Sequence, residues 1–252
     1  MPLDFSRYFI FFLAFLLGIR HGIDWDHIAA ITDLTGTSDH KKEAFILGLW
    51  YIVGHAAVVI ILGLIAIIIG INLPEWIDPL MERFVGITLV ILGLWLLFSI
   101  FRHGSRFQLR SRWMLILDAL NRLSLFLHNK IPHRFEHDQL RQDRGKKALK
   151  AAFIVGMIHG VGVETPTQVL LFVTAAGVSH SFFAVILLVT FVLGLMLSNT
   201  LISVLSILGY AKAKKNSSAF LVLGLITAVI SLIVGSLFLF NRGSVLPAIL
   251  GG

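Results

Sequence analysis

Six apolar stretches, each long enough to cross a lipid bilayer as a helix, constrain this chain more than any other feature. They cover roughly residues 5–33, 43–70, 82–102, 149–176, 181–207 and 218–241. Lipid offers no partner for unpaired backbone groups, so such stretches must be helical. Only 14% of the 252 residues are charged, against about a quarter in soluble domains. We therefore expect an all-α, polytopic membrane protein with about six transmembrane helices.

Basic residues are concentrated between the third and fourth apolar stretches. About a dozen of the 21 lysines and arginines lie between Arg102 and Lys150, whereas the connections at 73–75 and 177–179 have almost none. This asymmetry predicts that 103–148 is a cytoplasmic loop, that both termini lie outside, and that the chain is a multi-pass protein of the cell (inner) membrane. A basic charge gathered in one loop also argues against nucleic acid as a partner.

The basic loop has an internal pattern of its own. Apolar residues recur at helical spacing from Trp113 to Leu127, which predicts an amphipathic helix that lies on the membrane or docks onto the protein. The following stretch, Arg134 to Lys150, is mostly charged, so we expect it to be solvated.

The two halves of the chain resemble each other. Gly-Ile-Arg-His-Gly at 18–22 matches Gly-Met-Ile-His-Gly at 156–160, and Asp26 falls opposite Glu164. Gly54 falls opposite Gly194 at nearly the same offset. Three expected spans in each unit mean that the second copy enters from the opposite side, as in transporters with inverted repeats. We predict one repeat at 1–102 and the other at 149–252.

Ionisable residues gather inside the apolar stretches, where each costs several kcal/mol. With only Arg20 nearby as a cation, Asp24 and Asp26 leave an excess negative charge that a bound dication would neutralise. The chain has no cysteine, and imidazole with carboxylate suits nickel, cobalt, zinc, iron and manganese. A structural ion-pair network is the rival interpretation. The predicted metal ligands are His21, Asp24, Asp26, His27, His55, His159 and Glu164.

Helix geometry ranks the residues of the first stretch. In an unbroken helix, His21, Asp24 and His27 share a face about 120° wide, so they can converge on one ion. Asp26 lies off that face and reaches the ion only if Gly22 loosens the turn. Asp33 lies near the end of the stretch, where we expect an interfacial position.

The segment from Arg20 to Ile28 resembles the signature of the NiCoT family of nickel/cobalt transporters, which has His, four residues, then Asp-His. The stretches 54–59, 162–168 and 194–200 are similar to further elements of that family, in the same order. The departures are Glu164 and Asn199 where the family has Asp, and Gln168 where it has Glu. The family also usually has eight spans. The resemblance implies a permease that takes up nickel or cobalt, and related permeases export.

The predicted function is therefore transport of a divalent transition-metal ion, with no cofactor beyond that ion. The sequence lacks a Gly-x-x-x-x-Gly-Lys-Ser/Thr loop, so the chain is not itself an ATPase. The alternatives are a metal exporter of the same fold, an intramembrane metal-dependent enzyme, and a proton-coupled carrier of another solute. Two further alternatives concern the loop histidines His103, His128, His133 and His137. One is that they sense metal or exchange it with a cytoplasmic metallochaperone. The other, which we favour because their spacing is irregular, is that they are ordinary loop residues.

Overall fold

The computed structural model describes residues 5–36, 40–69, 77–103, 137–161, 181–214 and 216–246, and the regular structure in these ranges is helical. The helices are α1 (Phe5–Gly22), α2 (Trp25–Gly36), α3 (Lys41–Ile69), α4 (Ile77–His103), α6 (His137–Gly160), α8 (Ser181–Ala213) and α9 (Ser217–Leu239), followed by the short 3-10 helix η2 (Gly243–Val245). The expected all-α class is confirmed for this part of the chain.

Several helices are suited to a lipid environment. The segments Lys41–Ile65, Phe182–Ala213 and Ser217–Leu239 are each long and apolar enough to cross a membrane. The pair Tyr8–Gly22 and Trp25–Gly36 is a fourth candidate, in which the second helix is bent by 59° from the direction of the first. Large apolar side chains are exposed along these helices, as expected of a surface that lipid covers. The described ranges thus contain three or four candidate spans, while the fourth expected stretch continues beyond them after Val161.

The fourth expected stretch, which was predicted to start at 149, belongs to a longer helix, because α6 already begins at His137. Leu, Arg, Gln, Lys and Ala dominate its first turns, and all of them have favourable helix propensities. The small residues Ala148 and Ala152, in the middle of α6, are buried in the same hydrophobic cluster as Tyr51 of α3, so the helix is anchored there and beyond its charged first turns. The amphipathic helix predicted at 113–127 lies outside the described residues.

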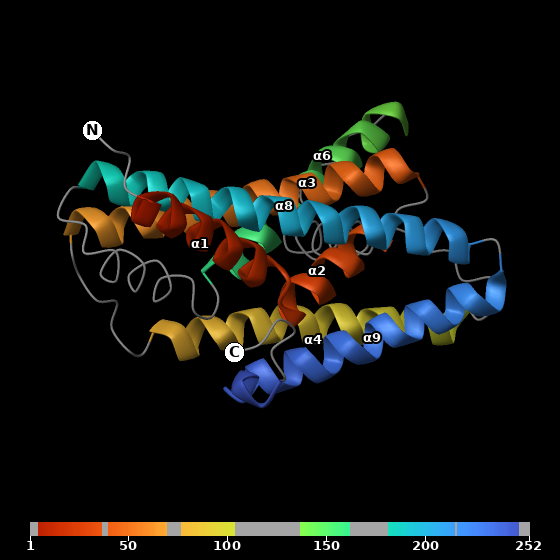
Figure 1. The fold of residues 1–252 in the computed structure, drawn as a ribbon. Helices are drawn as coiled ribbons and strands as arrows, with labels where there is room; N and C mark the ends of the chain where they lie inside the picture. Colours follow the sequence, from red (N-terminus) through yellow and green to blue (C-terminus); the bar gives the residue numbers. More distant parts are fainter. Residues whose placement is uncertain are drawn as a thin grey trace, which may run out of the picture.

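The long helices pack in three pairs, α1 with α8, α3 with α6 and α4 with α9 (Figure 1). A glycine permits the close approach at each crossing. Gly18 of α1 lies against the Phe191 backbone of α8, and Gly54 of α3 lies against the Phe153 backbone of α6. In the third pair, a Cβ on Gly235 would lie 2.9 Å from the carbonyl oxygen of Gly86. Small residues at such crossings let helix backbones meet, which is how helices associate in membranes.

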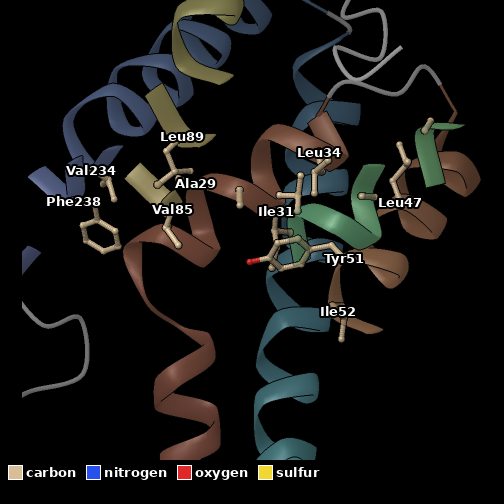
Figure 2. Close-up of a cluster of buried hydrophobic side chains, with 14 residues drawn as sticks. Ala29, Ile31, Leu34, Leu47, Tyr51, Ile52, Val85, Leu89, Val234 and Phe238 are labelled. Carbon is tan, nitrogen blue, oxygen red and sulfur yellow. The ribbon is translucent and has the colours of Figure 1, made fainter. Parts of the chain in front are cut away.

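Helix α2 is short and buried between the pairs. It packs against α3, α8 and α9, and Figure 2 shows its Ile31 and Leu34 beside Tyr51 of α3. Asp33 on α2 is buried and accepts a hydrogen bond of 3.1 Å from the Ser231 hydroxyl of α9. The expected interfacial position of Asp33 is therefore wrong. The bend of 59° before α2 directs this segment into the protein interior.

Candidate metal site

The first span breaks where the sequence reads Gly22-Ile23-Asp24. Helix α1 ends at Gly22 and α2 begins at Trp25. The Ile23 amide closes the last turn of α1 on the carbonyl oxygens of Ile19 and Arg20. The Asp24 side chain accepts a hydrogen bond of 2.9 Å from the Trp25 amide, so it stabilises the start of the new helix. Gly22 lets α1 end close to α8, because a Cβ at this position would meet the Ser198 hydroxyl and lie 3.1 Å from the carbonyl oxygen of Leu195.

Three buried histidines meet beside this break. His21 comes from the last turn of α1, His27 from the first turn of α2, and His55 from the middle of α3. Their ligand atoms all lie within 4.8 Å of one another, and the two Nε2 atoms of His27 and His55 are 3.4 Å apart. No more than 6% of any of the three residues is exposed. We call these three side chains the histidine triad.

A buried carboxylate contacts one histidine of the triad on the side away from the other two. The Nδ1–H of His27 donates a 2.9 Å hydrogen bond to Oδ1 of Asp26, which is itself buried. That bond orients the ring and leaves Nε2 facing His55, the arrangement that metal-binding histidines adopt with a carboxylate partner. Asp26 also interacts electrostatically with His21, His55 and His159. Asp26 is therefore close enough to interact electrostatically with all four buried histidines.

The spacing of the triad fits a first-row dication. Two nitrogen ligands on one ion, with bonds of about 2.1 Å, lie about 3.4 Å apart at a tetrahedral angle. The observed separation of His27 and His55 matches this value. No two ligands of one ion can lie more than about 4.2 Å apart at this bond length, so the widest pair of the triad must close only slightly. Imidazole nitrogens, one of them oriented by a carboxylate, favour borderline dications such as nickel, cobalt and zinc.

The structure brings together only some of the predicted site residues. The geometric argument from an unbroken helix is wrong, because the helix ends at Gly22 and restarts in a new direction. As a result, Asp24 is exposed at the break, whereas Asp26 is buried against His27. His159 of α6 is buried nearby but does not belong to the triad. Glu164 lies outside the described residues.

Two buried side chains near the site did not emerge from the sequence. Tyr51 precedes His55 by one helical turn, and its ring centroid is 6.1 Å from that of His55. Phe191 of α8 packs on His21, with ring centroids 5.7 Å apart. The spacing of four residues between Tyr51 and His55 was a signal, since such residues share a helix face. Phe191 lies far away in the sequence and offered none.

The chain matches the NicO family, described as high-affinity nickel-transport proteins, over residues 7–242. It is 26% identical to the urease accessory protein UreH of Bacillus sp. strain TB-90 over 92% of this chain and 90% of that protein. It is 34% identical to a high-affinity nickel transport protein of Cupriavidus necator, over 28% of this chain and 20% of that one. The cobalt transport protein NhlF of Rhodococcus rhodochrous is 26% identical over 65% of this chain. The chain spans only 48% of the length of NhlF. No solved structure matches significantly.

Proposed function

We propose that this chain, which belongs to the NicO family of high-affinity nickel-transport proteins, carries a nickel or cobalt dication across the membrane by way of the histidine triad. The observation that supports this most directly is three buried imidazoles whose ligand atoms lie within 4.8 Å of one another. Membership of a family of transport proteins argues against the enzyme alternative, and the triad supplies the donor atoms that such a cargo needs.

Each predicted ligand has a role in this proposal. His21, His27 and His55 bind the ion directly, while Asp26 orients His27 and offsets part of the ion's charge. Asp24, exposed at the helix break, attracts the ion before it sheds its water. His159 and Glu164 belong to the second half of the path. Ligand nitrogens must be unprotonated to bind metal, so we expect uptake to weaken at low pH.

The inverted repeat is part of the proposal, and the helix crossings support it. With the sequence offsets of 138 and 140 residues, Gly18 corresponds to Gly156 and Phe191 to Tyr51. Gly18 lies against the Phe191 backbone, and Gly156 lies against the Tyr51 backbone. The residues in contact at the first crossing therefore correspond to the residues in contact at the second. In addition, α1 and α6 end at the corresponding residues Gly22 and Gly160. Broken helices at the repeat interface are where such transporters bind substrate.

The second crossing of each helix pair obeys the same relation. Gly194 of α8 lies against the Phe15 backbone, and Gly54 of α3 lies against the Phe153 backbone. Phe15 corresponds to Phe153 at the offset of 138, as Gly54 corresponds to Gly194 at 140. We propose six spans arranged as two such units, joined by the basic segment 103–148.

The driving force follows from the proposed orientation, with both termini outside and the basic segment in the cytoplasm. A dication that moves inward gains about 4.6 kcal/mol per 100 mV of membrane potential, twice the value for one charge. That free energy supports an inward concentration ratio of roughly a thousandfold. Uptake therefore needs no nucleotide hydrolysis by this chain.

Metal movement into proteoliposomes tests the proposal. We expect the protein to carry nickel and cobalt into vesicles with an inside-negative potential, and we expect His27→Ala to abolish this transport. His40→Ala is the matched control, because His40 is exposed at the start of α3 and lies outside the triad. The proposal fails if the parent protein moves neither metal, or if His27→Ala transports as fast as His40→Ala.

A further inference from the structure

A second buried pair of polar side chains lies next to the triad. It consists of His159 of α6 and Tyr51 of α3, whose ring centroids are 5.7 Å apart. At most 1% of either residue is exposed. Nδ1–H of His159 donates a 2.9 Å hydrogen bond to the carbonyl oxygen of Val155, so Nε2 of the neutral ring carries a free lone pair. Neither this Nε2 nor the Tyr51 hydroxyl has a hydrogen-bond partner among the residues that the structure describes.

An unpartnered buried polar atom is costly, so two of them on neighbouring rings call for a ligand or a water. The Tyr51 side chain extends from α3 into the buried cluster (Figure 2), where an aliphatic or phenylalanine side chain would fill the space without this cost. The pair is therefore better explained by something polar that occupies the position than by packing alone.

The pair has a counterpart in the triad. At the repeat offsets, His159 corresponds to His21 and Tyr51 to Phe191. His21 and Phe191 have ring centroids 5.7 Å apart, the same separation as His159 and Tyr51. The position of His159 in the second repeat is thus the position of a triad residue in the first. The one chemical difference in the aromatic partner is the added hydroxyl of Tyr51.

The pair of His159 and Tyr51 also lies directly beside the triad. The Tyr51 ring neighbours two histidines, with its centroid 6.1 Å from that of His55 and 5.7 Å from that of His159. Asp26, which orients His27, also interacts electrostatically with His159. A cation that leaves the triad toward α6 would therefore stay close to the same carboxylate.

We propose that His159 and Tyr51 form a second, weaker station for the transported dication, in which Nε2 of His159 binds the cation and the Tyr51 hydroxyl hydrogen-bonds to its remaining water. This inference rests on the proposed function. The second station is weaker because Leu195 occupies the position that corresponds to His55. A carrier needs such a step, since an ion held by three imidazoles must exchange onto fewer ligands before it is released.

The variants Tyr51→Phe and His159→Gln test this station separately from the triad. Tyr51→Phe copies the residue found at the corresponding position 191, so it removes the hydroxyl and keeps the ring. We expect both variants to keep the tight nickel binding of the triad in a thermal-shift or calorimetric titration. We expect the initial rate of nickel uptake into proteoliposomes to fall by roughly tenfold in Tyr51→Phe, as for the loss of one buried hydrogen bond, and further in His159→Gln.

Tyr210→Phe is the matched control, because Tyr210 is also buried but its hydroxyl is 2.7 Å from the Thr227 hydroxyl, away from the histidines. It should transport at the parent rate. If Tyr51→Phe also transports at that rate, the pair holds only a buried water and the station is refuted. If Tyr51→Phe loses nickel binding, Tyr51 supports the triad and the station is again refuted. Failure of the proposed function itself would appear differently, as absence of transport by the parent protein.

Discussion

Replacing Gly18 by alanine should force α1 away from α8 and open the histidine triad. A Cβ at position 18 would lie against the carbonyl oxygen of Phe191, 2.8 Å from its carbonyl carbon and 3.0 Å from the Leu195 amide nitrogen. These are backbone atoms of a neighbouring helix, so they cannot rotate aside as the end of a flexible side chain could.

The size of the effect follows from these distances. Carbon atoms in contact normally lie about 3.5–4.0 Å apart, so α1 must retreat by roughly 1 Å. Overpacking of this kind costs about 1–3 kcal/mol, which corresponds to a melting temperature lower by roughly 2–12 °C for a chain of this size. His21 lies one turn further along α1 and moves with it. The ligand atoms of the triad now lie within 4.8 Å of one another, so a further separation of this size would leave at least one histidine out of reach of the ion. Nickel affinity should then fall by roughly 10- to 100-fold.

Melting temperature in detergent, measured with and without nickel, checks both effects. Gly209→Ala on α8 is the matched control, because Gly209 is exposed and nothing lies within 4 Å of the added Cβ. Alanine there should be neutral or stabilise the helix by up to about 1 kcal/mol. Gly18→Ala should therefore lower the melting temperature, whereas Gly209→Ala should leave it unchanged or raise it. A Gly18→Ala protein that melts at or above the parent temperature and keeps the full nickel-induced rise would refute the close crossing and its link to the triad.

Three further predictions concern the site, the cargo and the orientation. His21→Ala and His27→Ala should each remove the nickel-induced rise in melting temperature, since a ligand stabilises only the state that binds it, whereas His40→Ala should keep the rise; an unchanged rise in the first two would make these histidines packing residues. Cobalt and nickel should compete for uptake well ahead of magnesium and calcium, because imidazole donors favour borderline ions, and equal inhibition by magnesium would indicate a hard, hydrated site instead. A single cysteine at Gln142 should react with a membrane-impermeant reagent only from the inside and one at Ser244 only from the outside. The chain contains no cysteine of its own, and the reverse labelling would overturn the proposed orientation.

The apolar stretches of the sequence located most helices well. The expected stretches 43–70, 181–207 and 218–241 correspond to α3, α8 and α9 with end points that differ by a few residues. These elements are predictable because local hydropathy decides whether a stretch can lie in lipid. The start of α6 was missed, because a charged stretch can still be helical when its residues favour the helix and its far end is anchored in the core.

The sequence also determined the chemistry of the site. His21, Asp26, His27 and His55 stand out from sequence alone because ionisable residues are rare and costly in apolar stretches. What the sequence left open was which carboxylate joins the histidines. An unbroken helix favours Asp24, but the break that Gly22 permits against Ser198 exposes Asp24 and buries Asp26.

Residue types and apolar patterns are local properties, so the sequence alone determined that this is a helical chain with histidines and carboxylates in apolar segments. Only the tertiary structure decided that α1 breaks at Gly22, that His55 of α3 meets His21 and His27, and that Tyr51 lies beside His159. These arrangements depend on contacts between helices far apart in the sequence, where a single missing Cβ sets how closely two backbones approach. The direction in which a side chain points at such a crossing is fixed by its neighbours, and no pattern within one helix contains that information.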